Sequence, residues 1–317
     1  MVVKPVSFWI EQERLNFKIV RCLTVILRTA GCYWAKKSGC LMCGFIKEAR
    51  SGIGFKELKE QLEYAIADKE FDMIKIFTSG SFFDTNEVPI SFREYLYDKL
   101  DKLEVKKLII ESRPEFINKN IAKELKKQSF ISEVAIGLES ADDFIRNYCI
   151  NKGFTFKDFE KAAKILKKEK IRVKAYLLLK PPFLSEAEAI EDVYNSALKI
   201  KDLVDVVSIN LTNVQTGTYV EKLWKNKLYR PPWLWSAVEV LSRIKKSKIE
   251  VISDPVAAGK IRGPHNCGKC DRIVEKAIRK FSLTQQLEEL EDLYCNCIYL
   301  WKKILELENY SRIPLVL

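Results

Sequence analysis

Three cysteines lie close together near the start of the chain, in the segment GCYWAKKSGCLMCGF at residues 31–45. Seven residues separate Cys32 from Cys40, and two separate Cys40 from Cys43. Thiolates at such spacing favour zinc or an iron-sulfur cluster. A structural zinc site needs four protein ligands, and no histidine or further cysteine near Cys43 supplies the fourth. A cluster with three cysteine ligands instead leaves one iron open to a substrate or cofactor. A structural metal or reduced thiols are the alternative.

A second group of cysteines lies near the end of the chain and consists of Cys267, Cys270, Cys295 and Cys297. Four thiolates in two close pairs fit a tetrahedral structural zinc site, which would stabilise a small domain with little core of its own. A second iron-sulfur cluster is the alternative, because it could relay electrons to the first. The group therefore predicts a metal site, with zinc favoured.

The remaining features of the composition set broad limits. Cys22 and Cys149 lie in largely apolar surroundings and are expected to be buried packing residues. Lysine and arginine number 54 against 43 acidic residues, and this excess of +11 attracts polyanions, although solvated lysine-rich helix faces would give the same count. No apolar run is long enough for a membrane span, and the first residues do not resemble a signal peptide. We therefore expect a cytoplasmic protein that is not bound to a membrane.

Short apolar, β-branched segments alternate with amphipathic helical segments through most of the chain. The expected strands cover residues 19–29, 73–79, 106–112, 133–139, 172–179, 205–211 and 249–253. The expected helices between them cover residues 55–67, 92–103, 116–127, 156–169 and 186–200, and the last has a capping box made by Ser185 and Glu188. The alternation predicts an α/β fold of parallel strands with crossover helices, which either an open doubly wound sheet or a full or partial barrel satisfies.

The unusual residues follow the strands, where the loops of such folds form binding sites. The cysteine loop follows the first strand, and SGSFFD, ESRPE, GLES, LKPPF and NLTNVQTG follow the next five. The alternation stops after residue 253, so we divide the chain into an extension (1–18), an α/β domain (19–253) and a mostly helical metal-binding domain (254–317). Two helical stretches are expected in the last domain, around residues 272–281 and 283–308.

The cysteine loop and the loops after it resemble the radical S-adenosylmethionine superfamily, whose fold is a full or partial TIM-type barrel, here of the (β/α)6 kind. In that superfamily three cysteines hold a [4Fe-4S] cluster, and S-adenosylmethionine occupies the open iron and yields a 5′-deoxyadenosyl radical. The resemblance makes Cys32, Cys40 and Cys43 the cluster ligands. The usual spacing between the first two cysteines is three residues rather than seven, and Met42 stands where an aromatic residue is usual.

Further loop residues match positions that contact the cofactor in this superfamily. Ser79, Gly80 and Ser81 occupy the place of the glycine-rich motif that binds the methionine amino group. Glu111 and Arg113 resemble the third-strand motif of the elongator-protein-like branch, where they would face polar groups of the cofactor. Glu139 stands where that branch has a polar residue near the ribose.

Longer phrases are similar to the radical S-adenosylmethionine enzymes of archaeosine formation. They include FWIEQER, LLKPPFLSEAEAIEDV, YRPPWLWSAVEVL and RGPHNCGKCD. The resemblance implies a lyase that acts on tRNA, in which the radical takes hydrogen from a lysine adduct on the 7-deazaguanine at position 15. Carbon–nitrogen cleavage would then leave archaeosine. It also implies a lysine-transferring partner subunit related to transglycosylases and an electron donor.

Residues of the later loops are candidates for binding the substrate, although loop capping or strand-end hydrogen bonding is the commoner role for any one of them taken singly. They are Lys180, Asn210, Asn213, Gln215 and Thr218. His265 is expected to form a local hydrogen bond in a Gly-Pro turn, and Lys260 and Arg262 to line an RNA-binding face or to be ordinary surface charges. Two other functions stay open: modification of a different tRNA base by an elongator-like enzyme, and a non-enzymatic metal-binding protein that interacts with RNA.

Overall fold

The structure is a computed structural model that describes residues 3–316. Its eight strands follow one another in a single sheet in the order of the sequence. The strands are β1 (Ser7–Leu15), β2 (Lys18–Ile26), β3 (Met73–Phe77), β4 (Lys107–Glu111), β5 (Ile131–Glu139), β6 (Arg172–Leu179), β7 (Val206–Leu211) and β8 (Val251–Ser253). The helices are α1 (Tyr33–Lys37), α2 (Phe55–Ile66), α3 (Ile90–Lys102), α4 (Lys119–Lys126), α5 (Phe156–Lys168), α6 (Glu186–Ile200), α7 (Tyr219–Lys225), α8 (Leu234–Lys246), α9 (Asp271–Thr284), α10 (Glu288–Glu291) and α11 (Cys297–Ser311).

The alternation predicted from the sequence is confirmed. All seven predicted strands and all five predicted helices form, with ends that shift by a few residues. The predicted capping box at α6 also forms: the Ser185 hydroxyl oxygen accepts a bond of 3.1 Å from the amide of Glu188, whose carboxylate accepts one of 2.9 Å from the amide of Ser185. The chain therefore has the predicted α/β fold, with a helical C-terminal segment that carries the second cysteine group.

Strand β1 was not predicted, and it pairs antiparallel with β2. Its charged residues hide the strand pattern in the sequence. Glu11 and Glu13 both pair with Lys75 of β3, whose ammonium nitrogen lies 3.0 Å from the Glu11 carboxylate. A strand that carries acidic side chains toward a half-buried lysine does not show the simple alternation of apolar and polar residues.

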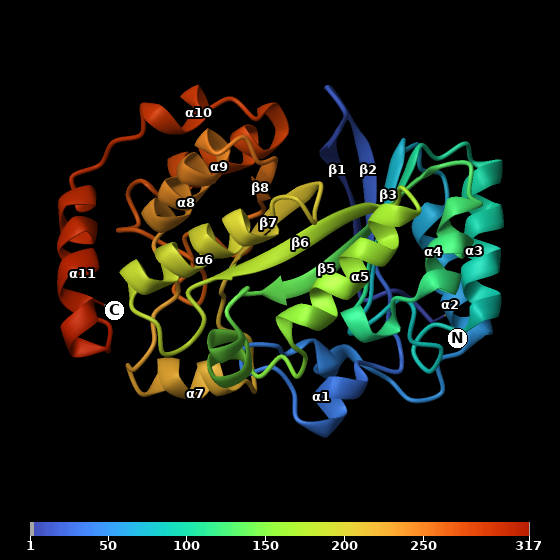
Figure 1. Cartoon of the computed structure of the whole chain (residues 1–317), viewed down its shortest axis with the longest axis horizontal. Helices are drawn as coiled ribbons and strands as arrows, with labels where there is room; N and C mark the ends of the chain where they lie inside the picture. The colour runs from blue at the N-terminus through green and yellow to red at the C-terminus, as the bar shows by residue number, and fades with distance from the viewer. Residues whose placement is uncertain (1–2, 317) are drawn as a thin grey trace. The chain divides into compact units, whose positions relative to one another are not determined.

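The chain forms two compact units. The first contains residues up to Gly39 together with Phe45–Gly137 and Lys157–Lys174. In it β2, β3, β4 and β5 pair in parallel, and the strands bury a continuous set of side chains that includes Leu23, Ile74 and Leu108. Figure 1 shows α2, α3 and α4 grouped beside these strands.

The second unit contains Cys40–Gly44, Leu138–Phe156 and the chain from Ala175 onward. Strands β7 and β8 pair in parallel within it, with Val207 opposite Val251. Helix α6 packs against α8 and α11, and α9 packs against α8 and β8 (Figure 1). The C-terminal helices therefore belong to the same compact body as the later strands, and the predicted boundary near residue 254 stays a prediction.

The second helical stretch predicted for the tail, residues 283–308, is interrupted in the structure. Helix α9 ends at Thr284, where Gln285 takes a left-handed conformation with φ of 61°. Helix α11 then begins at Cys297, so Cys295 lies before it rather than on it. The interruption turns Cys295 and Cys297 toward the same point, which a regular helix would not do for residues two apart.

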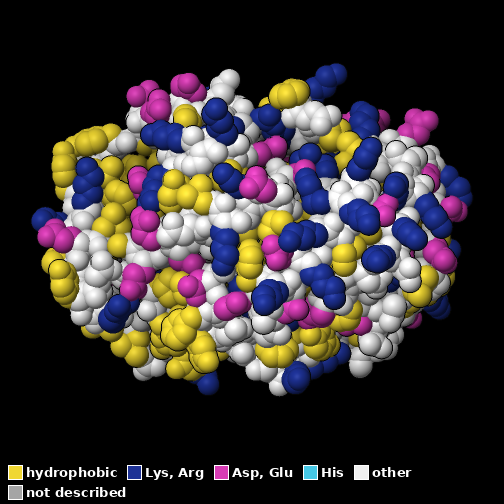
Figure 2. Space-filling model, in the orientation of Figure 1, with side chains coloured by type: hydrophobic (Ala, Val, Ile, Leu, Met, Phe, Trp, Pro, Cys, Tyr) yellow, Lys and Arg dark blue, Asp and Glu magenta, His cyan; other side chains and the backbone are white. Residues whose placement is uncertain are grey.

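Two observations concern the surface of the chain. Among residues 3–316 no helix combines the length and the apolar character needed to cross a membrane. Lysine and arginine side chains are scattered among acidic ones over the face shown in Figure 2.

Candidate functional site

Cys32 lies in the first unit, in the loop that follows β2. It is half-buried and immediately precedes the short helix α1. Gly31 before it has φ of +91°, and a Cβ atom at this position would lie 2.6 Å from the Cβ of Ala49. Only glycine satisfies both conditions, so the loop is shaped by the residue next to Cys32.

The predicted glycine-rich loop packs directly against Cys32. A Cβ atom on Gly80 would lie 2.7 Å from the Cα of Cys32 and 2.6 Å from a carboxylate oxygen of Glu87. The backbone at Gly80 can approach the cysteine this closely only because glycine has no side chain. Ser79 is half-buried, and its hydroxyl lies 3.5 Å from the carbonyl oxygen of Phe45. Two motifs that are separate in the sequence, the first cysteine and the loop after β3, are therefore in direct contact in the structure.

Arg113 is buried at the end of β4 beside the residues that follow Cys32. Its Nε donates a bond of 2.6 Å to Glu115, and its guanidinium lies 5.5 Å from the ring centres of both Tyr33 and Trp34. Burial, together with a hydrogen bond to Glu115, raises the pKa of Tyr33 to about 12. The ring of Tyr33 therefore stays uncharged and packs under the cation.

Glu111 is half-buried at the end of β4, and its carbonyl accepts a bond of 2.9 Å from the amide of Phe82. This bond joins the β4 end to the loop that carries the glycine motif. The predicted roles of Glu111 and Arg113 toward a cofactor stay predictions.

Cys40 and Cys43 lie in the second unit, in the segment Cys40–Gly44, and both are half-buried. The amide of Leu41 donates a hydrogen bond of 2.9 Å to the carbonyl of Ile150. The carbonyl of Leu41 accepts a hydrogen bond of 3.2 Å from the amide of Val220. Met42 packs against two buried clusters, one around Ile150 and one around Val220. The segment that carries the cysteine pair is thus held by the backbone of Leu41 and by the side chain of Met42.

Gln215 holds the end of the same segment. Its side-chain oxygen accepts a bond of 2.6 Å from the amide of Gly44, next to Cys43, and a Cβ atom on Gly44 would lie 3.1 Å from that oxygen. Thr218 caps α7 and donates a bond of 2.7 Å to the carbonyl of Gln215. Both residues were predicted to bind substrate, and the structure engages both in shaping the cysteine loop.

Glu139 is the last residue of β5 and Lys180 follows β6, and both have left-handed conformations, with φ of 67° and 59°. Such values are uncommon for residues with side chains and are concentrated at functional sites. The Glu139 carboxylate lies 2.6 Å from the ammonium of Lys152. The Lys180 ammonium is buried and pairs with Glu186 at 2.5 Å and with Glu308 at 3.3 Å. Both predicted site residues therefore have charged partners of their own.

Asn210 and Asn213 lie at the end of β7 and in the loop after it, and both are half-buried. Within residues 3–316 neither side-chain amide forms a hydrogen bond. Among the predicted substrate residues, these two offer donors and acceptors that the fold itself does not use.

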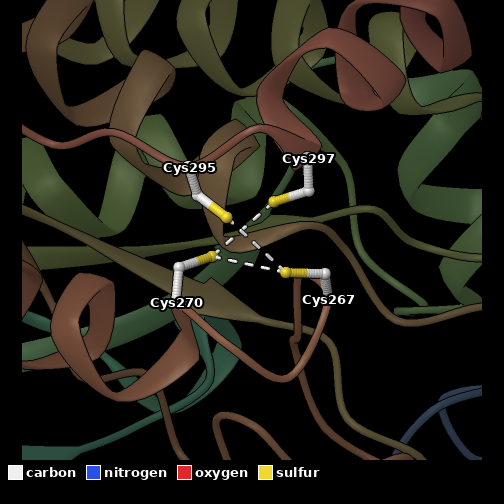
Figure 3. A group of neighbouring side chains, drawn as sticks. All are labelled: Cys267, Cys270, Cys295 and Cys297. Carbon is white, nitrogen blue, oxygen red and sulfur yellow. Dashed lines mark hydrogen bonds between the residues drawn. The ribbon is translucent and has the colours of Figure 1, made fainter.

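The second cysteine group is assembled entirely within the second unit. Figure 3 shows its four sulfur atoms pointing toward one another, and all of them lie within 4.8 Å of each other. The sulfur of Cys267 lies 4.0 Å from that of Cys270 and 3.7 Å from that of Cys295, while Cys270 and Cys297 are 3.6 Å apart. The predicted metal-binding group is therefore brought together as one tetrahedral set of thiols.

Two side chains outside the group donate hydrogen bonds to its sulfur atoms. The indole nitrogen of Trp235 lies 3.2 Å from the sulfur of Cys297, and the amide nitrogen of Asn266 lies 3.3 Å from that of Cys270. Asp271 orders the loop by accepting bonds from the amides of Asn266 and Gly268, at 2.8 and 2.7 Å. Donors of this kind stabilise thiolates and orient metal ligands.

The residues around the Gly-Pro turn are fixed by local bonds. His265 has its Nδ1 atom 2.8 Å from the carbonyl oxygen of Gly263, and burial together with Arg230 lowers its pKa. Arg262 donates a hydrogen bond of 2.7 Å to the Glu221 carboxylate and another of 3.1 Å to the carbonyl of Val214. Lys260 is exposed. The local role expected for His265 is therefore present, and Arg262 is held in the fold.

No motif or spacing in the sequence assigned a role to Glu87, Trp235 or Asn266. Glu87 is buried beneath the Gly80 loop, and its only signal in the sequence is an acidic residue seven positions after that glycine. Asn266 directly precedes Cys267, which is a usable signal for a residue near the metal ligands. Trp235 is remote in sequence from all four cysteines, so nothing in their spacing pointed to it.

Comparisons with known proteins agree with these observations. The model of the Radical SAM superfamily matches residues 26–195. A protein of Methanosarcina acetivorans named archaeosine synthase subunit beta is 43% identical, over 97% of this chain and 92% of its own length. A protein of Thermococcus kodakarensis with the same name is 42% identical, over 95% of this chain and 96% of its own length.

Two solved structures share the fold. Queuine lyase from Clostridium spiroforme, bound to SAM and queuine, is 21% identical with a TM-score of 0.50, over 68% of this chain and 86% of its own. Elp3 from Methanocaldococcus infernus is 22% identical with a TM-score of 0.50, over 67% of this chain and 55% of its own. At these identities the likeness shows the fold alone, which is the partial-barrel type predicted from the sequence. The matches along nearly the whole chain show more: this chain belongs to the radical S-adenosylmethionine superfamily and, within it, to the family of archaeosine synthase beta subunits.

Proposed function

We propose that this chain is the radical-generating subunit of an archaeosine synthase and acts as a carbon–nitrogen lyase on tRNA. The proposed substrate carries a lysine adduct on the 7-deazaguanine at position 15. A hydrogen atom of the lysine carbon bonded to the adduct nitrogen would pass to the 5′-deoxyadenosyl radical, and one further electron would pass to a one-electron acceptor. Water would then add to that carbon as its bond to the nitrogen breaks, which would release the lysine fragment as an aldehyde. The products are the formamidine of archaeosine and an oxidised lysine fragment. The observation that carries the proposal is the similarity to beta subunits over 97% of the chain.

The residues of the first cysteine group fit a [4Fe-4S] cluster with S-adenosylmethionine. Three half-buried thiols, Cys32, Cys40 and Cys43, are one ligand short of a closed site, and the backbone at Gly80 packs directly against Cys32. When bound, the cluster and S-adenosylmethionine supply a 5′-deoxyadenosyl radical that abstracts hydrogen from an unactivated carbon. The chain would contribute the backbone of residues 79–81, with Glu111, Arg113 and Glu139, to hold the polar groups of the cofactor.

We further propose that Asn210 and Asn213 bind the substrate, because their amides are unused by the fold. Lys180 and Gln215 are better suited to shape the site, since both are engaged by neighbouring groups. The relatives are named as one subunit of a synthase, which supports a partner subunit that transfers lysine to the tRNA. An electron donor completes the proposed set of partners, and a tRNA substrate implies a cytoplasmic reaction.

Zinc is the proposed metal of the second cysteine group. Zinc–sulfur bonds of about 2.3 Å in a tetrahedron put the sulfur atoms about 3.8 Å apart. The separations in this group, 3.6, 3.7 and 4.0 Å, are close to that value. In an iron-sulfur cluster the four thiolates are distributed over two or more irons, so their sulfur atoms cannot all lie as close together as around a single ion. The compact set of thiols therefore favours zinc over a second cluster.

Anaerobic reconstitution tests the proposed reaction. The protein is loaded with iron and sulfide, reduced with dithionite, and incubated with S-adenosylmethionine and tRNA that carries the lysine adduct. We expect 5′-deoxyadenosine and archaeosine to form together, and neither to form with Cys40→Ala. Formation of 5′-deoxyadenosine with modification of a different base would favour the elongator-like alternative. Failure to bind iron and sulfide at all would leave only a non-enzymatic role.

A further inference from the structure

Glu87 is a buried carboxylate that accepts hydrogen bonds from two separate loops. It lies between β3 and α3, and only 1% of its surface is exposed. One carboxylate oxygen accepts a hydrogen bond of 2.6 Å from the hydroxyl of Thr29 and another of 3.0 Å from the amide of Gly80. The other accepts 2.7 Å from the amide of Ser81. A single side chain thus binds the loop before Cys32 and the loop that carries the glycine motif.

These bonds continue at both ends into a chain that links the ends of three neighbouring strands. The Thr29 hydroxyl oxygen also accepts 3.2 Å from the amide of Gly31, next to Cys32. The Ser81 hydroxyl oxygen accepts 3.0 Å from the amide of Arg113. The loops after β2, β3 and β4, which hold most of the first unit's predicted cofactor residues, are therefore tied together through Glu87.

The position of the carboxylate also sets how closely the two loops meet. The space above Gly80 is bounded by a carboxylate oxygen of Glu87 on one side and by Cys32 on the other, each within 3 Å of where a Cβ would stand. Moving or weakening the carboxylate would release the Gly80 and Ser81 amides and let the loop move away from the cysteine.

The two carboxylate oxygens of Glu87 meet three hydrogen-bond donors. Burial raises its pKa, and the bonds from Thr29, Ser81 and Gly80 act against that rise. A carboxylate can accept all three bonds at once, whereas a neutral amide of the same size has only one oxygen to accept with. The three donors therefore select an acidic residue rather than any polar residue of that size.

We propose that Glu87 is a positioning residue, which fixes residues 79–81 against Cys32 and so presents the loop that receives S-adenosylmethionine. The cofactor part of this role rests on the proposed function, whereas the hold on the loop is a property of the chain itself. Glu87 touches neither substrate nor cofactor in this role, because its oxygens are used by the three donors. The role can therefore be tested without any catalysis.

The first test is Glu87→Gln in the full chain without cofactor. The substitution keeps the size of the side chain but sets an NH2 group against at least one backbone N–H. We expect hydrogen exchange at the Gly80 and Ser81 amides to become about tenfold faster or more, because the substitution removes an acceptor from this pair of buried hydrogen bonds. The matched control is Glu57→Gln, since Glu57 also accepts a bond from a glycine amide, that of Gly54 at 3.0 Å. Unchanged exchange at Gly80 and Ser81 would overturn the proposal.

The second test measures binding of S-adenosylmethionine to the anaerobically reconstituted protein by calorimetry. For Glu87→Gln we expect a Kd raised about tenfold with unchanged iron content, and no change for Glu57→Gln. Faster exchange with an unchanged Kd would overturn the positioning role. A wild-type protein that bound no S-adenosylmethionine would refute the proposed function instead, and the exchange experiment would still decide whether Glu87 holds the loop.

Two variants of Thr29 test the same proposal if Glu87→Gln does not fold. Thr29→Val keeps the shape of a fully buried residue but removes the hydroxyl that donates to Glu87. Thr29→Ser keeps that hydroxyl. We expect faster exchange at Gly80 and weaker S-adenosylmethionine binding for Thr29→Val, with recovery in Thr29→Ser. If the two Thr29 variants behaved alike, the hydrogen bond from the Thr29 hydroxyl to Glu87 would not help to hold the loop, which would contradict the proposal.

Discussion

The two cysteine groups of this chain are built in different ways. The second group, Cys267, Cys270, Cys295 and Cys297, is a closed set of four thiols inside one compact unit, with side-chain donors directed at its sulfur atoms. The first group offers only three thiols, and its members are divided between the two units: Cys32 belongs to one, Cys40 and Cys43 to the other.

The difference follows from what each group must leave open. A closed thiol set satisfies a metal completely and therefore serves the fold. An incomplete set leaves room for a ligand, and Gly31, Gly44 and Gly80 allow the backbone beside its cysteines to pack more closely than a residue with a side chain would. We infer that the first group serves chemistry and the second serves stability, and the predictions below separate these roles.

The largest effect is expected from Cys40→Ala. Removal of one of three cluster ligands should abolish iron-sulfur absorption and the formation of 5′-deoxyadenosine, while about one zinc ion per chain is retained in the second group. Metal and sulfide analysis of anaerobically purified protein gives both numbers. Cys22→Ala is the matched control, because Cys22 is a buried thiol outside both groups. A Cys40→Ala protein that still cleaved S-adenosylmethionine would contradict the assignment of the ligands.

Cys270→Ala removes one thiol from the second group. We expect this variant to lose zinc and to keep the iron of the first group. Binding of zinc to such sites is coupled to folding. Loss of one ligand should therefore lower the free energy of unfolding by on the order of several kcal/mol. Thermal denaturation followed by circular dichroism measures the change. Cys149→Ala, which removes a buried thiol from the same unit, should cost only about 1 kcal/mol. A fall in iron content rather than zinc would identify a second cluster.

The sequence predicted the elements and the ligand groups because their signals are local. Cysteine spacing is read directly from neighbouring residues, and the alternation of strands and helices is read from windows of a few turns. The capping box at Ser185 is local too, and it formed as expected. Each of these features depends on residues that are close along the chain.

The features that escaped prediction depend on residues far apart in sequence. The bond between Thr29 and Glu87 spans 58 residues, and that between Trp235 and Cys297 spans 62. Strand β1 looked like a charged extension because its glutamates pair with Lys75, 62 and 64 residues away. A buried carboxylate or indole is recognisable as part of a site only when the fold shows which donors or acceptors it meets.

A third prediction concerns the glycine contact that distinguishes the first group. In Gly80→Ala the new Cβ would stand 2.6 Å from Glu87 and 2.7 Å from Cys32, so the loop must shift. Overpacking of this kind costs about 1–3 kcal/mol, and S-adenosylmethionine binding should weaken in the same variant while zinc content stays unchanged. Gly54→Ala is the control, because its Cβ would come no closer than 3.6 Å to Glu57. Calorimetry and thermal denaturation of both variants measure the two effects, and equal behaviour of the pair would contradict the close approach.

The smallest effect is expected at the second group, from Trp235→Phe. This substitution keeps most of the packing but removes the indole N–H that lies 3.2 Å from the sulfur of Cys297. Loss of one donor to a thiolate should weaken zinc binding by about tenfold, the lower end of what outer partners of metal ligands contribute. Trp301→Phe is the matched control, because the Trp301 indole donates to the hydroxyl of Ser236 at 2.9 Å and not to a sulfur. Competition with a chromogenic chelator should release zinc sooner from Trp235→Phe than from Trp301→Phe, and iron loading of the first group should be the same in both. If the two tryptophan variants released zinc alike, the second group would depend on its four thiols alone.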